Sequence, residues 1–129
     1  MPKKRKAVAW LLRRVSSEGQ EDGMGLEAQL AAVQVHAKRA GFKKGQIVTV
    51  DPETWSGYDE DDVLVNRPAM SRVLREAHPG DAFFWDKSDR PARSPYVKEQ
   101  LIRAMLSGGF RWFSDGLEWD LPLQPITLT

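Results

Sequence analysis

The sequence predicts an α/β fold in which helices flank a mostly parallel central sheet of four to five strands. Short apolar runs alternate along the chain with segments whose apolar residues recur at the helical period. Alternation with short connections is typical of βαβ units, whose strands are parallel. Residues 82–85 are apolar without alternation, as expected of a strand buried on both faces. The 129 residues are enough for one domain with a single core.

Two strands and one helix make up the first half of the predicted domain. Residues 8–12 are expected to form a strand that is followed by Arg-Val-Ser and a polar loop, and residues 47–50 form the next strand. Residues 26–40 are predicted to be a helix that stops at Gly41. Residues 51–66 are expected to be a long polar loop. The apolar face of the helix consists of Leu26, Leu30, Val33 and Ala37.

The second half repeats this alternation. A helix is predicted over residues 68–77, with Asn66 as its cap and Pro79-Gly80 as its end. After the strand at 82–85, a third helix over residues 94–107 is stopped by Gly108-Gly109. Residues 110–113 and 117–119 are expected to be short final strands. The second helix has an apolar stripe of Met70, Val73, Leu74 and Ala77.

Residues 8–121 are expected to form the domain, between a basic N-terminal tail (1–7) and a proline-studded C-terminal tail (122–129). The net charge is only +1, from 19 basic and 18 acidic residues, so partners must be judged from where the charges lie. The densest basic cluster is Lys3-Lys4-Arg5-Lys6. It is open to three interpretations: a solvated tail, an arm that contacts phosphates, or a nuclear-localisation-like signal.

The composition excludes several classes of site. Cysteine is absent, which excludes disulfides, a thiolate nucleophile and a zinc-finger module. His36 and His78 form no ligand cluster, so we expect neither a metal nor another cofactor. No apolar stretch approaches the roughly 20 residues that cross a bilayer. We therefore expect no membrane partner and a cytoplasmic protein.

The first strand leads into a candidate nucleophile. Ser16 follows Arg14 by two residues, directly after an apolar run. In open α/β sheets, sites form beyond the carboxyl ends of the strands. A hydroxyl beside a guanidinium there suits attack on an anionic substrate. The alternative from this segment alone is that Ser16 and Ser17 are ordinary loop hydroxyls.

Several basic residues are predicted to gather at the same end of the sheet. Arginine suits phosphate because its planar fork of donors stays charged. Arg67 and Arg90 each precede a proline, which favours extended backbone, so both are expected at the mouth of their elements and pointing off the sheet. Arginines around one hydroxyl favour phosphoryl transfer. The candidates after the third strand are Lys87, Asp89, Arg90 and Arg93.

An ordered series of motifs carries a family resemblance. It consists of Arg14-Val15-Ser16, Gln20, Gly25-Leu26-Glu27-Ala28-Gln29, Ser56-Gly57, Arg67-Pro68-Ala69-Met70, Gly80-Asp81, Lys87-Ser88-Asp89-Arg90-Pro91-Ala92-Arg93 and Gly109-Phe110-Arg111-Trp112-Phe113. In this order and spacing, residues 8–120 resemble the N-terminal catalytic domain of the serine recombinases, the resolvase/invertase superfamily. The large serine integrase-like branch is the most similar.

The resemblance implies a resolvase-like fold and a DNA strand transferase. The serine of the family attacks a DNA phosphodiester, forms a covalent 5′-phosphoserine intermediate and releases a 3′-hydroxyl, without ATP or a metal cofactor. Double-stranded DNA is the implied partner, with self-association as a dimer or tetramer in the full-length protein and a nucleoid-associated role. The implied roles are Ser16 as nucleophile, Arg14, Arg67, Arg90 and Arg93 as phosphorane-stabilising groups, and Gln20, Gln29, Lys87 and Asp89 as supporting groups.

The sequence departs from the family pattern at three points. Pro91 replaces the usual leucine, and Trp85 and Asp86 stand where aliphatic or basic residues are usual, so that Asp86 is expected to neutralise part of the site near Lys87. The chain also ends at Thr129, before the long helix and DNA-binding region typical of the family. We therefore expect weak DNA binding and no recombination by this chain alone.

Two alternatives belong to other classes. Pro91 and the missing helix favour a catalytically silent resolvase-fold module for interaction or regulation. A receiver-type phosphotransfer domain would need acidic residues after the first strand, where this chain has Arg-Arg-Val-Ser.

Overall fold

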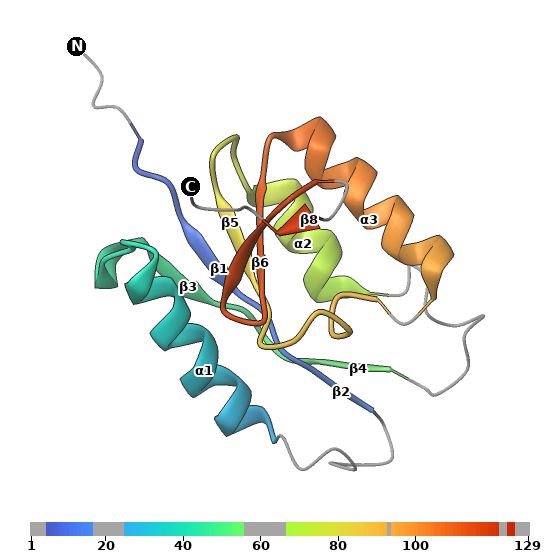
Figure 1. Cartoon of the computed structure of the whole chain (residues 1–129), viewed down its shortest axis with the longest axis horizontal. Coiled ribbons are helices and arrows are strands. Elements are labelled where there is room, and N and C mark those ends of the chain that lie inside the picture. Colours follow the sequence, from blue (N-terminus) through green and yellow to red (C-terminus); the bar gives the residue numbers. More distant parts are fainter. Residues whose placement is uncertain (1–4, 17–24, 56–66, 93, 122–123, 126–129) are drawn as a thin grey trace.

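A computed structural model of the chain describes residues 5–16, 25–55, 67–92, 94–121 and 124–125. Helix α1 covers one face of a central sheet, and helices α2 and α3 cover the other (Figure 1). The elements in chain order are β1 (Ala9–Leu11), β2 (Arg14–Ser16), α1 (Leu26–Arg39), the 3₁₀ helix η1 (Lys44–Gln46), β3 (Ile47–Thr49), β4 (Glu53–Trp55), α2 (Pro68–Glu76), β5 (Ala82–Phe84), α3 (Pro95–Gly108), β6 (Arg111–Ser114), β7 (Leu117–Asp120) and β8 (Gln124–Pro125).

The sheet has the predicted α/β character. Its strand order is β3-β1-β5-β6-β7-β8, and the first four of these strands are parallel. Strands β7 and β8 are antiparallel additions at one edge. The two-residue β8 falls within the segment 122–129 that was predicted to be a tail, and it makes the sheet one strand wider than expected.

Alternate residues of the central strands enter two separate cores. In β5, Ala82 and Phe84 join the cluster under α1, whereas Phe83 packs with Trp85 in the cluster under α2 and α3. All three β5 residues are buried, as the uninterrupted apolar run predicted. The helices begin and end within one residue of the predicted positions, and Gly109 ends α3 with a left-handed φ of 74°.

Two short strands were missed by the sequence analysis. Residues Arg14–Ser16 and Glu53–Trp55 were predicted to be loops, but they form β2 and β4, a parallel two-stranded sheet. Each strand has only three residues and no apolar alternation, so neither carries a strand signal in its own sequence. The N-cap of α2 is Arg67, not the predicted Asn66, which lies outside the described residues.

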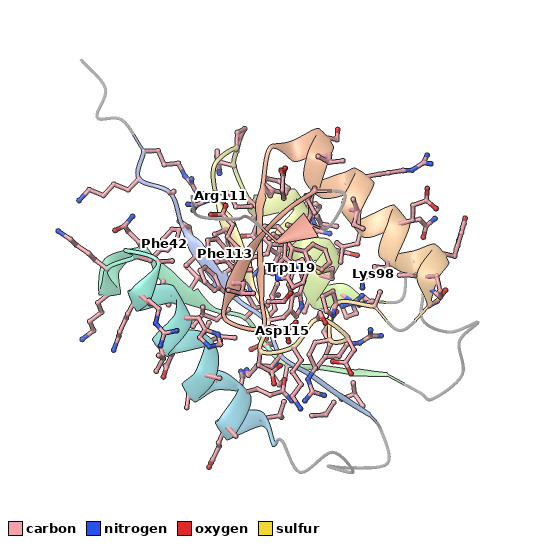
Figure 2. The ribbon with its side chains drawn as sticks, viewed as in Figure 1. Phe42, Lys98, Arg111, Phe113, Asp115 and Trp119 are labelled. Atoms are coloured by element: carbon pink, nitrogen blue, oxygen red, sulfur yellow. The ribbon has the colours of Figure 1, made fainter. Side chains whose placement is uncertain are left out.

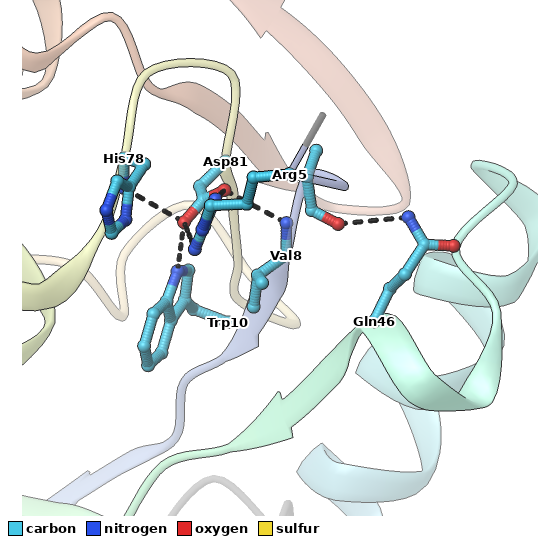
Figure 3. A network of polar contacts seen from close by, with 7 residues as sticks. Arg5, Val8, Trp10, Gln46, His78 and Asp81 are labelled. Atoms are coloured by element: carbon cyan, nitrogen blue, oxygen red, sulfur yellow. Dashed lines mark hydrogen bonds and ion pairs between the residues drawn. The ribbon is translucent and has the colours of Figure 1, made fainter. Parts of the chain in front are cut away.

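A polar network fastens the amino end of the sheet (Figure 3). The carboxylate of Asp81 is fully buried and accepts hydrogen bonds from the Arg5 guanidinium, the Trp10 indole and the backbone N–H groups of Val8 and His78. Burial alone would raise the pKa of Asp81, but these donors outweigh it and lower the pKa from 3.8 to about 2. Arg5, assigned by sequence to a tail, is thus tied to the domain.

Candidate functional site

The candidate nucleophile lies at the carboxyl end of β2. Ser16 is the last residue of that strand, and its Cα partner across the small sheet is Trp55 of β4. Strands β2 and β4 extend beyond the ends of β1 and β3, so Ser16 is carried past the edge of the central sheet (Figure 1). The side chain of Ser16 and the residues Gln20 and Arg93 lie outside the described part of the chain.

The backbone of Arg14 is held by two hydrogen bonds to the side chain of Gln29 in helix α1. Its backbone N–H donates to Oε1 of Gln29 at 3.0 Å, and Nε2 of Gln29 donates to the Arg14 carbonyl at 3.1 Å. Both side chains are buried, with 2% of Arg14 and none of Gln29 exposed. An amide that satisfies both backbone groups of one residue fixes that residue firmly. Gln29 therefore holds β2 in register two residues before Ser16.

Arg67 is held by a carboxylate that the sequence analysis did not single out. Its Nε and Nη2 donate to Oε1 of Glu53 at 3.2 and 2.6 Å, and its Nη1 donates to the carbonyl of Pro91. The other Glu53 oxygen accepts from the backbone N–H of Met70 at 3.2 Å. Glu53 thereby joins β4 to the first turn of α2.

The position of Arg67 agrees with the sequence only in part. Its backbone is extended, with φ −119° and ψ 85°, as its place before Pro68 predicted. Its side chain was expected to point off the sheet, and it is only 3% exposed. The ion pair with Glu53 explains the difference, because a paired guanidinium can be buried without an uncompensated charge.

Arg90 is buried in the same manner by another carboxylate. Its Nε donates to Oδ1 of Asp86 at 3.1 Å, and its backbone N–H donates to the Lys87 carbonyl at 3.2 Å. Lys87 and Asp89, predicted as supporting groups, are exposed. Asp86, which was expected to neutralise part of the site near Lys87, forms an ion pair with Arg90. Arg90 was also expected to point off the sheet, and it is only 3% exposed.

These contacts connect the three described candidate arginines. Arg14 lies opposite Glu53 in the pairing of β2 with β4, Glu53 binds Arg67, and Arg67 binds the carbonyl of Pro91, the residue after Arg90. Segments from three separate parts of the chain thus meet beyond the carboxyl ends of the parallel strands. This is the location in which open α/β sheets form their sites.

A groove opens beside this network, between β4 and the start of α2. Its volume is about 350 Å³, and it reaches the Glu53–Arg67 pair. Two acidic and two basic residues contribute to its walls, so it is a mixed-charge surface. The lining residues are Val50, Asp51, Pro52, Glu53, Thr54, Arg67, Pro68, Ala69 and Arg72.

Glu53 was not predicted from the sequence, and neither was Arg90 as the partner of Asp86. Glu53 stands among other acidic residues in a segment with no periodicity, and its arginine partner lies 14 residues away. Asp86 is four residues before Arg90, a spacing that signals an ion pair on a helix but not in the bend that these residues form. Only the tertiary fold identifies both partners.

Metal and membrane features were sought in the described part of the chain. There, His, Asp and Glu residues form no group of three or more that could hold a metal ion. None of the described helices has the length and apolar character needed to cross a bilayer.

Comparison with known families adds an independent observation. A family model described as "Resolvase, N terminal domain" matches residues 9–110, which include every candidate site residue named above. A comparison with curated proteins found no match.

Proposed function

The chain belongs to the resolvase N-terminal domain family, the catalytic domain of serine recombinases, and on this premise we propose a specific activity for it. It is the catalytic domain of a site-specific recombinase of the large serine integrase type, with residues 8–121 as the catalytic unit. Its substrate is double-stranded DNA, and the working assembly is a dimer or tetramer of the full-length protein.

In the proposed reaction, Ser16 exchanges one phosphodiester for another. The Oγ atom of Ser16 attacks the scissile phosphorus and forms an O–P bond, while the bond from phosphorus to the 3′-oxygen breaks. The hydroxyl proton of Ser16 ends, in balance, on the departing 3′-oxygen. The 5′-phosphate stays on Ser16, so a 3′-hydroxyl of another strand can reverse the step without ATP.

The observation that carries this proposal is the joining of buried arginines beside the strand that ends at Ser16. Arg14, Arg67 and Arg90 are each at most 3% exposed, and contacts through Glu53 and Pro91 connect them. Preorganised cations in a site with little water stabilise the charge of a phosphorane far more than cations in water do. Arg93 completes the proposed set, and Gln20, Gln29, Lys87 and Asp89 are the proposed supporting groups.

One observation favours the second candidate function, a catalytically silent interaction module. All three guanidinium nitrogens of Arg67 already donate within the domain, to Glu53 and to Pro91. These bonds use three of the five guanidinium N–H groups and give Arg67 a structural role that needs no phosphate. A silent module would keep these contacts and would never form a bond to DNA.

A covalent trapping experiment separates the two candidates. The chain is fused to a sequence-specific DNA-binding domain and offered DNA with paired sites, and adducts that survive denaturation are counted. We expect adducts from the wild type and from Ser17→Ala, which keeps Ser16 and changes only its neighbour. Ser16→Ala should form none. Adducts that persist in Ser16→Ala would refute the nucleophile, and none from the wild type would favour the silent module.

A further inference from the structure

The loop that carries Arg90 contains a buried ion pair between Asp86 and Arg90. Asp86 and Arg90 are four residues apart, their side chains are only 2% and 4% exposed, and Nε of Arg90 lies 3.1 Å from Oδ1 of Asp86. The other described ion pairs of this spacing, Arg72–Glu76 and Glu99–Arg103, lie on exposed helix faces. A guanidinium is planar, so a bond at Nε limits the directions in which its other donors can point.

A second carboxylate braces the same loop from the turn between β6 and β7. The backbone N–H of Asp115 donates to the Asp86 carbonyl at 3.2 Å, and Oδ1 of Asp115 accepts from the backbone N–H of Ser88, also at 3.2 Å. Asp115 adopts a left-handed φ of 55° at this turn. Figure 2 shows it at the end of the sheet where β2 and β4 lie. The backbone on both sides of Lys87 is therefore tied to the hairpin.

We infer that Asp86, braced by Asp115, is a positioning residue that orients Arg90 toward the scissile phosphate. This inference rests on the proposed function. The ion pair uses the Nε donor of Arg90, and a phosphate oxygen would accept from the terminal nitrogens of the same plane. Asp86 itself touches no substrate. Its contribution is geometric, because a reacting geometry that shifts by about 1 Å can cost on the order of 100-fold in rate.

The inference predicts an effect on the chemical step and not on DNA binding. In the fused chain described above, Asp86→Asn should lower the adduct-forming rate at saturating DNA by about 10- to 100-fold, with the half-saturating DNA concentration unchanged. Asp86→Glu, which keeps the charge, should recover part of the rate. At the turn, Asp115→Asn keeps an acceptor for Ser88 and should be milder than Asp115→Gly, which keeps the backbone freedom but removes the acceptor.

A matched control uses the exposed pair on α3. Glu99→Gln breaks an ion pair of the same spacing at side chains that are 62% and 77% exposed, and it should leave the adduct-forming rate unchanged. A measurement that does not depend on activity is the hydrogen exchange of the Arg90 Nε–H, followed in nitrogen-15 NMR spectra. The signal of this group is assigned by its loss in Arg90→Lys. This proton should exchange slowly in the wild type and faster in Asp86→Asn.

The outcomes separate this inference from the proposed function. Wild-type adducts together with an unchanged or faster rate in both Asp86→Asn and Asp115→Gly would overturn the positioning role. A reduced rate with a raised half-saturating DNA concentration would overturn it as well, since Asp86 would then act on binding. If Asp86→Asn does not fold, the adduct-forming rates of Asp86→Glu and of the two Asp115 variants test the positioning role in its place. An absence of wild-type adducts would instead overturn the proposed function, with the NMR signal still reporting the ion pair.

Discussion

The two ends of the sheet both bury charged side chains, but they balance the charges differently. At the amino end, one carboxylate, Asp81, collects donors from Arg5, Trp10 and two backbone groups. At the carboxyl end, two carboxylates each bind one buried guanidinium: Glu53 binds Arg67, and Asp86 binds Arg90. A carboxylate that is paired on several sides stabilises a fold, and buried guanidiniums can in addition stabilise the charge of a bound anion. Buried charge at the amino end therefore stabilises the fold, and we propose that at the carboxyl end it also serves the reaction.

The largest expected effect comes from removing a cation at the carboxyl end. Arg90→Ala should abolish most adduct formation, because phosphate stabilisation is lost, and an orphaned Asp86 should cost about 3–5 kcal/mol of stability. The double variant Arg90→Ala/Asp86→Asn should recover part of the stability and none of the activity. Denaturant unfolding and adduct counting on the same samples check both. Recovery of adduct formation in the double variant would contradict the chemical role of Arg90 at the carboxyl end of the sheet.

The mirror experiment is made at the amino end. Asp81→Ala removes the acceptor of the Trp10 indole and of two backbone N–H groups, so we expect a loss of about 3–5 kcal/mol in the free energy of unfolding. The adduct-forming rate per folded molecule should not change. Arg5→Gln is the matched control: Arg5 is 40% exposed, so its loss should cost about 1 kcal/mol or less. A rate that fell with the stability would show that the ends are not separable.

Acid titration tests the role assigned to Asp81 at the amino end of the sheet. The pKa of Asp81 is lowered in the folded state from 3.8 to about 2, so its carboxylate stabilises the fold at pH values above about 4. That contribution, about 2 kcal/mol, should be lost as the pH falls from about 4 to about 2. Unfolding free energies measured across this range should show a shallower acid slope in Asp81→Asn. If the unfolding free energy depended on pH equally in the variant and the wild type, the ionised Asp81 would not stabilise the fold as we expect.

The smallest expected effect concerns the turn that braces the loop of Arg90. Gly116 has a φ of 73°, and a Cβ there would lie 3.3 Å from Nε2 of His36, so Gly116→Ala should cost about 1–2 kcal/mol. Gly41→Ala is the matched control, since its φ is 99° but a Cβ would meet nothing within 4 Å. Thermal unfolding of both variants isolates the His36 contact from backbone strain. A larger loss at Gly41 would contradict the packing of α1 against this turn.

The sequence predicted the parts of the fold that periodicity controls. Helices α1 and α2 and the doubly buried strand β5 follow from apolar spacing alone, and the extended backbone of Arg67 follows from Pro68. Strands β2 and β4 did not follow, because each has only three residues without an apolar pattern, and they form strand structure by pairing with each other. The Glu53–Arg67 pair, and with it the burial of Arg67, depends on that pairing and on the position of α2. The end of the sheet at which Arg14, Arg67 and Arg90 gather was therefore predictable, whereas the partners of these arginines were not.

The central claim is that the carboxyl end of the sheet performs chemistry through Ser16. The most direct measurement is mass spectrometry of the trapped protein–DNA adduct after digestion by a protease and a nuclease. The account predicts a nucleotide joined through its 5′-phosphate to the peptide that contains Ser16, at Ser16 itself. A nucleotide on another residue, or an adduct joined through a 3′-phosphate, would contradict it.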